Sequence, residues 1–237
     1  MSNSVEKRHS PVARVTLTDR AYEVIRDDIL YHLLPPGTLI TESALVSRYS
    51  IGKTPVREAL VRLAREGLVI SHPRKGHEIA PLTLAHAQEL FLARKLLEPA
   101  AARIAAERGV DIAGLNELEA LCDVPVDPSD HDSVVSFIKV NTAFHLGVTR
   151  ASGSTQLTRM LRDVIEQLDR YVYLGIVLSP PRATGYAHEH SDLLDALRDR
   201  DADRASEVAL EQVEWTERAV VSALMGTAAV QNASLGV

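Results

Sequence analysis

The chain has 237 residues, of which 46% are hydrophobic and only 4% aromatic, a composition typical of a packed, mainly helical protein. The sequence lacks both an apolar run of about eighteen residues and a signal-peptide core, so we expect a cytoplasmic protein that does not enter a membrane. A single cysteine, Cys122, excludes a disulfide within the chain and a zinc site with several cysteine ligands.

The net charge of −6 is distributed unevenly along the chain. Residues 1–81 carry 12 Lys and Arg against 9 Asp and Glu, a net charge of +3, whereas residues 82–237 carry 14 against 23, a net charge of −9. A basic N-terminal part joined to an acidic C-terminal part is typical of a small DNA-facing module attached to a partner domain. We therefore expect two domains.

The N-terminal region shows helical periodicity only after a short arm. Residues 1–16 have no periodic pattern, and we interpret them as a flexible arm. Thr18 is expected to cap a first helix that ends before Pro35, and Thr41 is expected to cap a second helix that ends near Arg48. The apolar residues on the buried side of the first helix are Ala21, Val24, Ile25 and Ile29.

The stretch 50–71, which reads SIGKTPVREALVRLAREGLVIS, contains the strongest helix signals. Thr54 followed by Pro55 predicts a helix start at Pro55, and Gly67 is expected to end the helix. The residues expected to pack inward are Val56, Ala59, Leu60 and Leu63, and those left facing outward are Lys53, Thr54, Arg57, Val61 and Arg65. A small basic helix face suits the DNA major groove, where cations meet phosphates and an arginine can pair with guanine.

Two strand-like segments, 68–71 and 77–80, follow this helix. They flank a turn, and the pattern predicts a hairpin that completes a winged helix-turn-helix domain over residues 17–81. An ordinary solvated turn would have the same composition, but next to a recognition helix we expect the basic tip to contact DNA phosphates. The predicted DNA-binding residues are Lys53, Thr54, Arg57, Arg74, Lys75 and Gly76.

Nearly every segment after Leu82 shows helical periodicity. We expect helices over about 83–108, 111–122, 133–151, 154–178, 184–199 and 201–225. No strand pattern is convincing here, so the sequence predicts an antiparallel α-helical bundle over residues 82–226 and a frayed tail over 227–237. The fold class is therefore mainly α.

Several polar residues fall on the inward faces of these helices. Arg94 lies in the stripe formed by Leu90 and Leu97, and a buried guanidinium needs either an internal partner such as Glu98 or the carboxylate of a bound acid. Inward polar groups on several helices are also how bundles build ligand and metal sites. The candidates are Asn141 and His145 at i and i+4 on one helix, and His190 and Gln212 on two others. Hydrogen-bonded core histidines are the alternative interpretation.

The segment KTPVREALVRLAREGLV resembles the recognition helix of GntR-type bacterial transcription regulators, whose usual pattern is S-R-T-P-V-R-E-A-L followed by R-L-x-x-E-G-L. Here Gly52 and Lys53 replace the usual Ser and Arg, and Lys lacks the planar fork that reads guanine. The segments FLARKLLEPAAARIAA, NTAFHLGV and HEHSDLLDALRDRDADRA resemble the effector (FCD) domain of the FadR-like branch. The resemblance implies a homodimer that binds a short palindromic operator and responds to a small organic acid.

The resemblance also bears on the bundle site. It implies that Arg94 holds the carboxylate of the acid, with Asn141, His145, His190 and Gln212 around it. The resembling family often holds a divalent metal there through an Asp or Asn and three His.

Because Asn141 and Gln212 are weak ligands, only His145 and His190 remain as good ones. We therefore expect weak or absent Zn or Ni. His188, two residues from His190, is expected to face elsewhere.

The alternative function is a metal-dependent helical-bundle enzyme. Against it, the bundle lacks the paired Glu-x-x-His motifs of di-iron proteins, and the chain has neither a Gly-rich phosphate loop nor a nucleophile elbow. We therefore favour a regulator that is not an enzyme.

Overall fold

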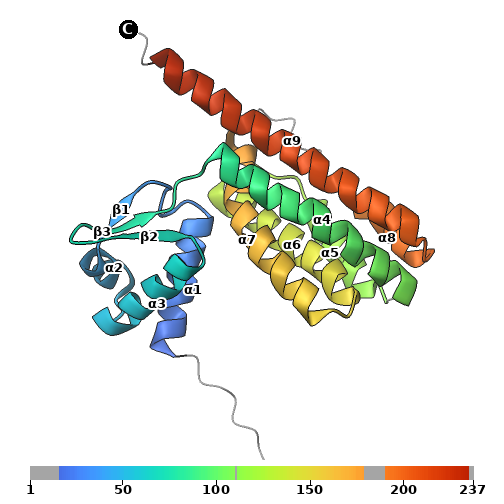
Figure 1. The fold of residues 1–237 in the computed structure, drawn as a ribbon, viewed down its shortest axis with the longest axis horizontal. Helices are drawn as coiled ribbons and strands as arrows, with labels where there is room; N and C mark the ends of the chain where they lie inside the picture. The colour runs from blue at the N-terminus through green and yellow to red at the C-terminus, as the bar shows by residue number, and fades with distance from the viewer. Residues whose placement is uncertain (1–15, 110, 179–189, 235–237) are drawn as a thin grey trace, which may run out of the picture.

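The computed structural model describes residues 16–109, 111–178 and 190–234, so most of the expected N-terminal arm, and His188, lie outside the described residues. The described chain forms two parts, shown in Figure 1. The head comprises three helices and a small sheet between residues 16 and 80, and the bundle comprises the helices from residue 84 onward. The mainly helical class and the winged helix-turn-helix are confirmed.

Helix α1 (Leu17–Leu30) begins earlier than expected, because Thr16 and not Thr18 is its N-cap. The Thr16 side chain accepts a hydrogen bond from the backbone N–H of Asp19, and the Asp19 carboxylate accepts one from the backbone N–H of Thr16. Only Thr16 has an acidic residue three positions later to complete this capping box. Thr18 instead donates a hydrogen bond to Glu58.

Helix α2 (Glu42–Tyr49) is capped by Thr41 as expected, whereas α3 (Lys53–Arg65) begins two residues before the predicted Pro55. Gly52, not Thr54, is its N-cap. Proline tolerates a place in the first turn because the N–H groups there have no partner within the helix.

The end of α3 at Gly67 is confirmed. This glycine has φ +75°, and Leu68 N–H returns to the Leu63 carbonyl at 3.0 Å. The inward residues Val56, Ala59, Leu60 and Leu63 are all fully buried.

The sheet of the head has three antiparallel strands in the order β1-β3-β2. Strands β2 (Val69–His72) and β3 (Gly76–Ile79) form the expected wing, with bounds shifted by one residue. Strand β1 (Leu39–Ile40) was not expected, because two residues give no periodicity. A Cβ on Gly76 would lie 2.7 Å from the Ile40 carbonyl oxygen, so this position requires glycine for the pairing of β1 with β3.

The bundle helices follow the expected order. They are α4 (Leu84–Arg108), α5 (Ala113–Cys122), α6 (His131–Ala151), α7 (Thr155–Leu178), α8 (His190–Arg198) and α9 (Ala202–Ser234). Helices α4 and α9 lie side by side along one flank, and α9 projects past the end of the bundle (Figure 1). Helix α9 continues to Ser234, past the expected end near residue 225, because the Ala-rich sequence after Gly226 contains no Pro or Gly that would end it. None of the described helices combines the length and apolar character needed to cross a membrane.

Helix α7 joins the bundle to the head. Arg170 of α7 is 3% exposed and donates a hydrogen bond to the Ala80 carbonyl, while its own carbonyl lies 2.9 Å from Nε2 of His32. Arg26 of α1 forms an ion pair with Glu166, one turn earlier on α7. Burial lowers the pKa of Arg170 to about 10. The bundle thus fixes both the end of α1 and the end of the wing through one helix.

Candidate functional site

The N-terminal half of α3 displays the predicted DNA-facing residues of the recognition helix, next to the first residue of α2. Lys53, Thr54 and Arg57 are exposed. The Arg57 guanidinium binds Glu42 through two hydrogen bonds of 2.8 and 2.9 Å, and Lys53 Nζ lies 3.7 Å from the same carboxylate. The hydrogen bond from Arg57 lowers the pKa of Glu42. Sequence reasoning missed Glu42, because its proximity to α3 depends on how the two helices pack.

The N-terminus of α3 adds donors to this surface. Gly52 provides no side-chain cap, and the first turn contains no acidic residue. The first N–H groups of a helix carry partial positive charge and bind phosphate oxygens well. This end of α3 therefore combines backbone donors with the cations of Lys53 and Arg57.

The wing tip carries the other predicted DNA-facing residues. Arg74 and Lys75 are exposed, and Arg74 has φ +67°, so the turn is tight. Gly76 is half-buried against β1, which gives it a structural role beside any contact with DNA. Two adjacent cations on a short turn are suited to phosphate contact.

In the bundle, the structure brings together four of the five predicted effector-site residues. Asn141 and His145 of α6, His190 of α8 and Gln212 of α9 line one cavity, whose other walls are Val172, Trp215 and Thr216. The cavity volume is about 20 Å³. This is room for roughly one water molecule and not for an organic acid.

The fifth predicted residue, Arg94, is paired inside the bundle. Its Nε lies 2.5 Å from Oε2 of Glu98, and the two side chains are 3% and 2% exposed. The other Glu98 oxygen, Oε1, lies 2.6 Å from Nδ1 of His145, but outside the direction of a ring N–H hydrogen bond. Arg94 is therefore linked to the cavity through Glu98 and then His145, and its contact with an acid stays a prediction.

Burial controls the charges around this cavity. It lowers the pKa of His190 to about 3 and also lowers the pKa of His145, so both imidazoles are neutral at pH 7. Burial alone would raise the pKa of Glu98, but the charge of the neighbouring Arg94 guanidinium holds it well below its usual range. Arg94 is thus the cation that balances an ionised Glu98.

A divalent metal fits this site poorly. The two neutral imidazoles have the right protonation state, but Asn141 and Gln212 contribute only amides. Glu98 adds a carboxylate near the site, which the sequence suggested only as a partner of Arg94. Its charge is already balanced by the Arg94 guanidinium. Among the described residues, no group of three or more His, Cys, Asp or Glu is arranged to hold a metal ion. The expectation of weak or absent metal stays a prediction.

Truncating one member of the buried pair should destabilise the fold. Arg94→Ala leaves Glu98 buried without its cation, and we expect the free energy of unfolding to fall by about 3–5 kcal/mol. Because the folded-state pKa of Glu98 lies below its unfolded value, the stabilisation is complete at neutral pH, begins to decrease below about pH 4 and is lost progressively as the pH falls toward the depressed folded-state pKa. Urea denaturation between pH 3.5 and 7 measures both effects.

Lys95→Ala on the same helix is the control. Its ion pair with Glu217 is partly exposed, so its loss should cost about 1 kcal/mol or less. Equal losses for Arg94→Ala and Lys95→Ala at pH 7 would contradict the assigned role of the buried pair.

Comparison with known proteins identifies both parts of the chain. Residues 17–79 match the family model described as bacterial regulatory proteins, gntR family, and residues 89–214 match the FCD domain. The HTH-type transcriptional repressor RspR of Escherichia coli (strain K12) is 26% identical over 201 residues, which cover 84% of this chain and 86% of RspR. The HTH-type transcriptional repressor GlaR of the same strain is 29% identical over 199 residues, which cover 79% of this chain and 88% of GlaR.

The solved structure of E. coli McbR/YncC has the same fold, with a TM-score of 0.76 and 21% identity over 88% of this chain and 99% of that one. RspR and GlaR are transcription regulators and not enzymes. The chain belongs to the gntR family of bacterial transcription regulators, with a DNA-binding GntR helix-turn-helix domain at its N-terminus and an FCD domain at its C-terminus.

Proposed function

We propose that this regulator acts in the cytoplasm as a homodimer that binds a short palindromic operator and responds to a small carboxylate held in the bundle. The observation that carries the proposal is the presence, in one chain, of an exposed basic α3 and a buried polar cavity. The helix provides the means of reading DNA. The cavity provides the site where a bound ligand changes the response of the regulator.

Base reading is assigned to Arg57 and phosphate contact to the wing. Glu42 holds the Arg57 guanidinium by two hydrogen bonds, yet the Arg57 side chain is 59% exposed. A guanidinium held in this way is already oriented when DNA arrives, and a guanine O6/N7 edge offers it the same bidentate geometry. Lys53, a point charge without a planar fork, contributes less to base discrimination.

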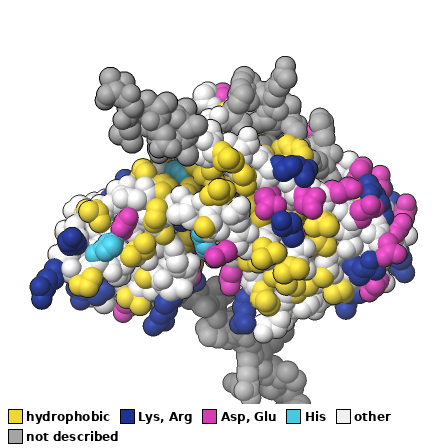
Figure 2. All heavy atoms as spheres, turned by 45° about the horizontal axis from the view of Figure 1, so that its top comes forward, with side chains coloured by type: hydrophobic (Ala, Val, Ile, Leu, Met, Phe, Trp, Pro, Cys, Tyr) yellow, Lys and Arg dark blue, Asp and Glu magenta, His cyan; other side chains and the backbone are white. Residues whose placement is uncertain are grey.

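An exposed apolar stripe on α4 supports a dimer. Leu92 and Leu96 are 57% and 67% exposed and lie at i and i+4, so they share one face of the helix. Figure 2 shows hydrophobic side chains grouped on the bundle, next to acidic ones. A second copy that covers this stripe would bury it and would match a twofold operator.

Effector binding requires the bundle cavity to open. A cavity of about 20 Å³ does not admit an organic acid, so side chains around His145 and His190 must move. An incoming carboxylate would compete with Glu98 for the Arg94 fork, because a guanidinium binds either carboxylate in the same bidentate way. Exchange of the Arg94 partner, with Glu98 taking up a proton as it loses its cation, is therefore the proposed switch.

The assignment of the DNA-facing residues is tested by two substitutions. Arg57→Ala should weaken binding to the preferred operator by roughly 10- to 100-fold and relax its sequence preference. Lys75→Ala should weaken operator and random DNA about equally and lower the salt slope by about 1. Fluorescence anisotropy at several salt concentrations measures both, with the exposed bundle residue in Arg150→Ala as the control. If Arg57→Ala weakened the affinity for operator and for random DNA equally, the assignment of base reading to Arg57 would be wrong.

The effector assignment needs a variant that keeps the buried charge. Arg94→Lys retains a cation beside Glu98 but removes the planar fork, so it should lose most of the response to the acid. Operator affinity without the acid should stay within about threefold of the wild type, because DNA is bound by a different part of the chain. The acid is found by thermal-shift screening, and anisotropy measures the response. A full response in Arg94→Lys would make Arg94 purely structural.

The metal prediction is tested by elemental analysis. Protein purified without chelators and without a metal-affinity tag should contain far less than one transition metal per chain, because two imidazoles and two amides bind a dication weakly. His145→Ala serves as the reference for background metal. About one tightly held metal per wild-type chain, lost in His145→Ala, would show that the prediction is wrong.

A further inference from the structure

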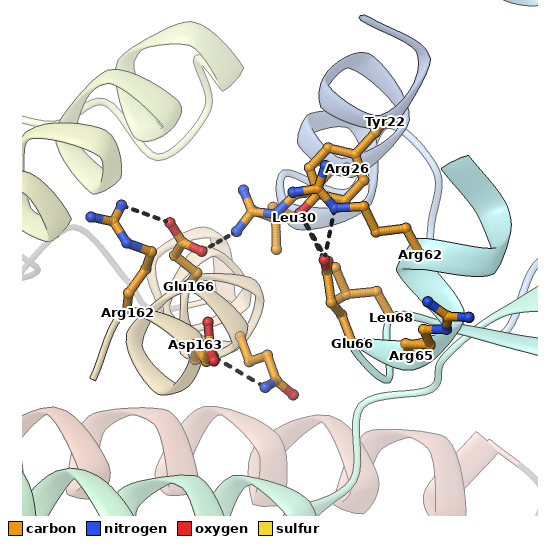
Figure 3. A pocket seen from close by; sticks show the side chains of 11 residues that line it. Tyr22, Arg26, Leu30, Arg62, Arg65, Glu66, Leu68, Arg162, Asp163 and Glu166 are labelled. Atoms are coloured by element: carbon orange, nitrogen blue, oxygen red, sulfur yellow. Dashed lines mark hydrogen bonds and ion pairs between the residues drawn. The ribbon is translucent and has the colours of Figure 1, made fainter. Parts of the chain in front are cut away.

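The head meets the bundle along a cleft between α1 and α3 on one side and α7 on the other. The volume of this cleft is about 420 Å³. Figure 3 shows that Arg26 of α1 reaches across to Glu166 of α7, which Arg162 contacts from the other side at 3.7 Å. The carboxylate of Glu166 thus has two cations, and its ion pair with Arg26 connects the two parts of the chain.

A second carboxyl group lies close to this ion pair but is buried. Asp169 follows Glu166 by three residues, so the two share one face of α7, and Asp169 is 5% exposed. Its Oδ1 accepts a hydrogen bond of 2.8 Å from Oγ1 of Thr142 on α6. Among the described residues, this hydroxyl is the one hydrogen-bond donor to the Asp169 side chain, and no cation forms an ion pair with it. A buried carboxyl with so little compensation is more stable as the neutral acid.

The charged groups around Asp169 do not supply the missing cation. Arg26 of α1 and Arg94 of α4 act on it from a distance, but each is paired with another carboxylate. Glu166 adds a like charge on the same face of α7. From the head, Tyr31 at the C-cap of α1 faces it, since burial and the charge of Asp169 both raise the pKa of the Tyr31 phenol. Asp169 therefore lies where α1 of the head meets α6 and α7 of the bundle.

The proton of Asp169 is exchangeable near neutral pH. Its pKa is raised to about 8, mainly by burial, against the opposing effect of the Thr142 hydrogen bond. The side chain is thus mostly protonated at pH 7 and releases its proton to water as the pH rises through 8. The carboxylate that remains has a single hydroxyl donor, so water must reach it between the end of α1, α6 and α7.

We propose that Asp169 is a proton-sensing residue between the head and the bundle, whose neutral form keeps the end of α1 packed against α7 and whose ionised form loosens that contact. The proton would act as a regulator in addition to the effector bound in the bundle, and the proposal does not depend on that effector. Loosening the contact changes the orientations open to the head. It therefore changes DNA binding by the difference in affinity between those orientations.

The titration is tested by Asp169→Asn, which removes the acid but keeps an oxygen that can accept the Thr142 hydrogen bond. Between the unfolded pKa of about 4 and the folded pKa of about 8, folding binds one proton at Asp169, so the wild type loses stability as the pH rises, up to about pH 8. The folding equilibrium constant of Asp169→Asn relative to the wild type should therefore rise about tenfold per pH unit and become constant above pH 8. Urea denaturation of the full chain between pH 5.5 and 9 measures this ratio. Asp163→Asn, an exposed position on α7, is the control and should keep the wild-type profile.

Two further measurements separate the titration from its effect on the head. Thr142→Val retains the acid but removes the hydroxyl that stabilises its ionised form, so the pH at which the loss of stability ends should move upward. Hydrogen exchange at the end of α1, corrected for the intrinsic rate at each pH, reports the contact with α7. Between pH 7 and 9, protection there should fall severalfold more in the wild type than in Asp169→Asn.

Each outcome decides for or against the proposal. A ratio of folding constants that does not change with pH would show that Asp169 binds no proton on folding. A ratio that changes while the end of α1 exchanges alike in the wild type and Asp169→Asn would remove the role of the proton in the contact with the head. The assignment to Asp169 is also overturned if Thr142→Val leaves the pH profile in place.

Discussion

A guanidinium and a carboxylate buried side by side constrain the core of the helical bundle. Neither Arg94 nor Glu98 can remain charged in the bundle without the other, because the desolvation of a single ion costs several kcal/mol. Their pairing sets the environment of His145, which lies against Glu98 and is neutral. The carboxylate ligand that we propose would meet a guanidinium already arranged around a carboxylate.

Helix α7 connects that bundle to the DNA-binding head. Val172 lines the bundle cavity, Arg170 holds the end of the wing at Ala80, and Glu166 pairs with Arg26 of α1. Within the described chain, Arg170 is buried with its Nε unpaired, and a buried guanidinium without a carboxylate is stable only while its surroundings stay in place. A small displacement of α7 thus alters its contacts with the bundle cavity and its contacts with the head.

The sequence was sufficient for features set by local spacing. The inward face of α3, the wing hairpin and most bundle helices follow from periodicity and turn residues, and the position of Arg94 follows from the stripe of Leu90 and Leu97. The start of α3 was two residues off, because proline tolerates the whole first turn. The partnership of Glu42 with Arg57, and the cleft between α3 and α7, could not be predicted. Both depend on the packing of separate helices, which no local pattern encodes.

We propose that α3 and the wing read a short twofold DNA sequence. Selection from a pool of random double-stranded DNA by the full-length protein tests this proposal, because selection assumes no operator in advance. We expect enrichment of sequences that share one short palindrome, with a guanine in each half-site for Arg57. Bound sequences that share no motif, or a motif without twofold symmetry, would contradict it.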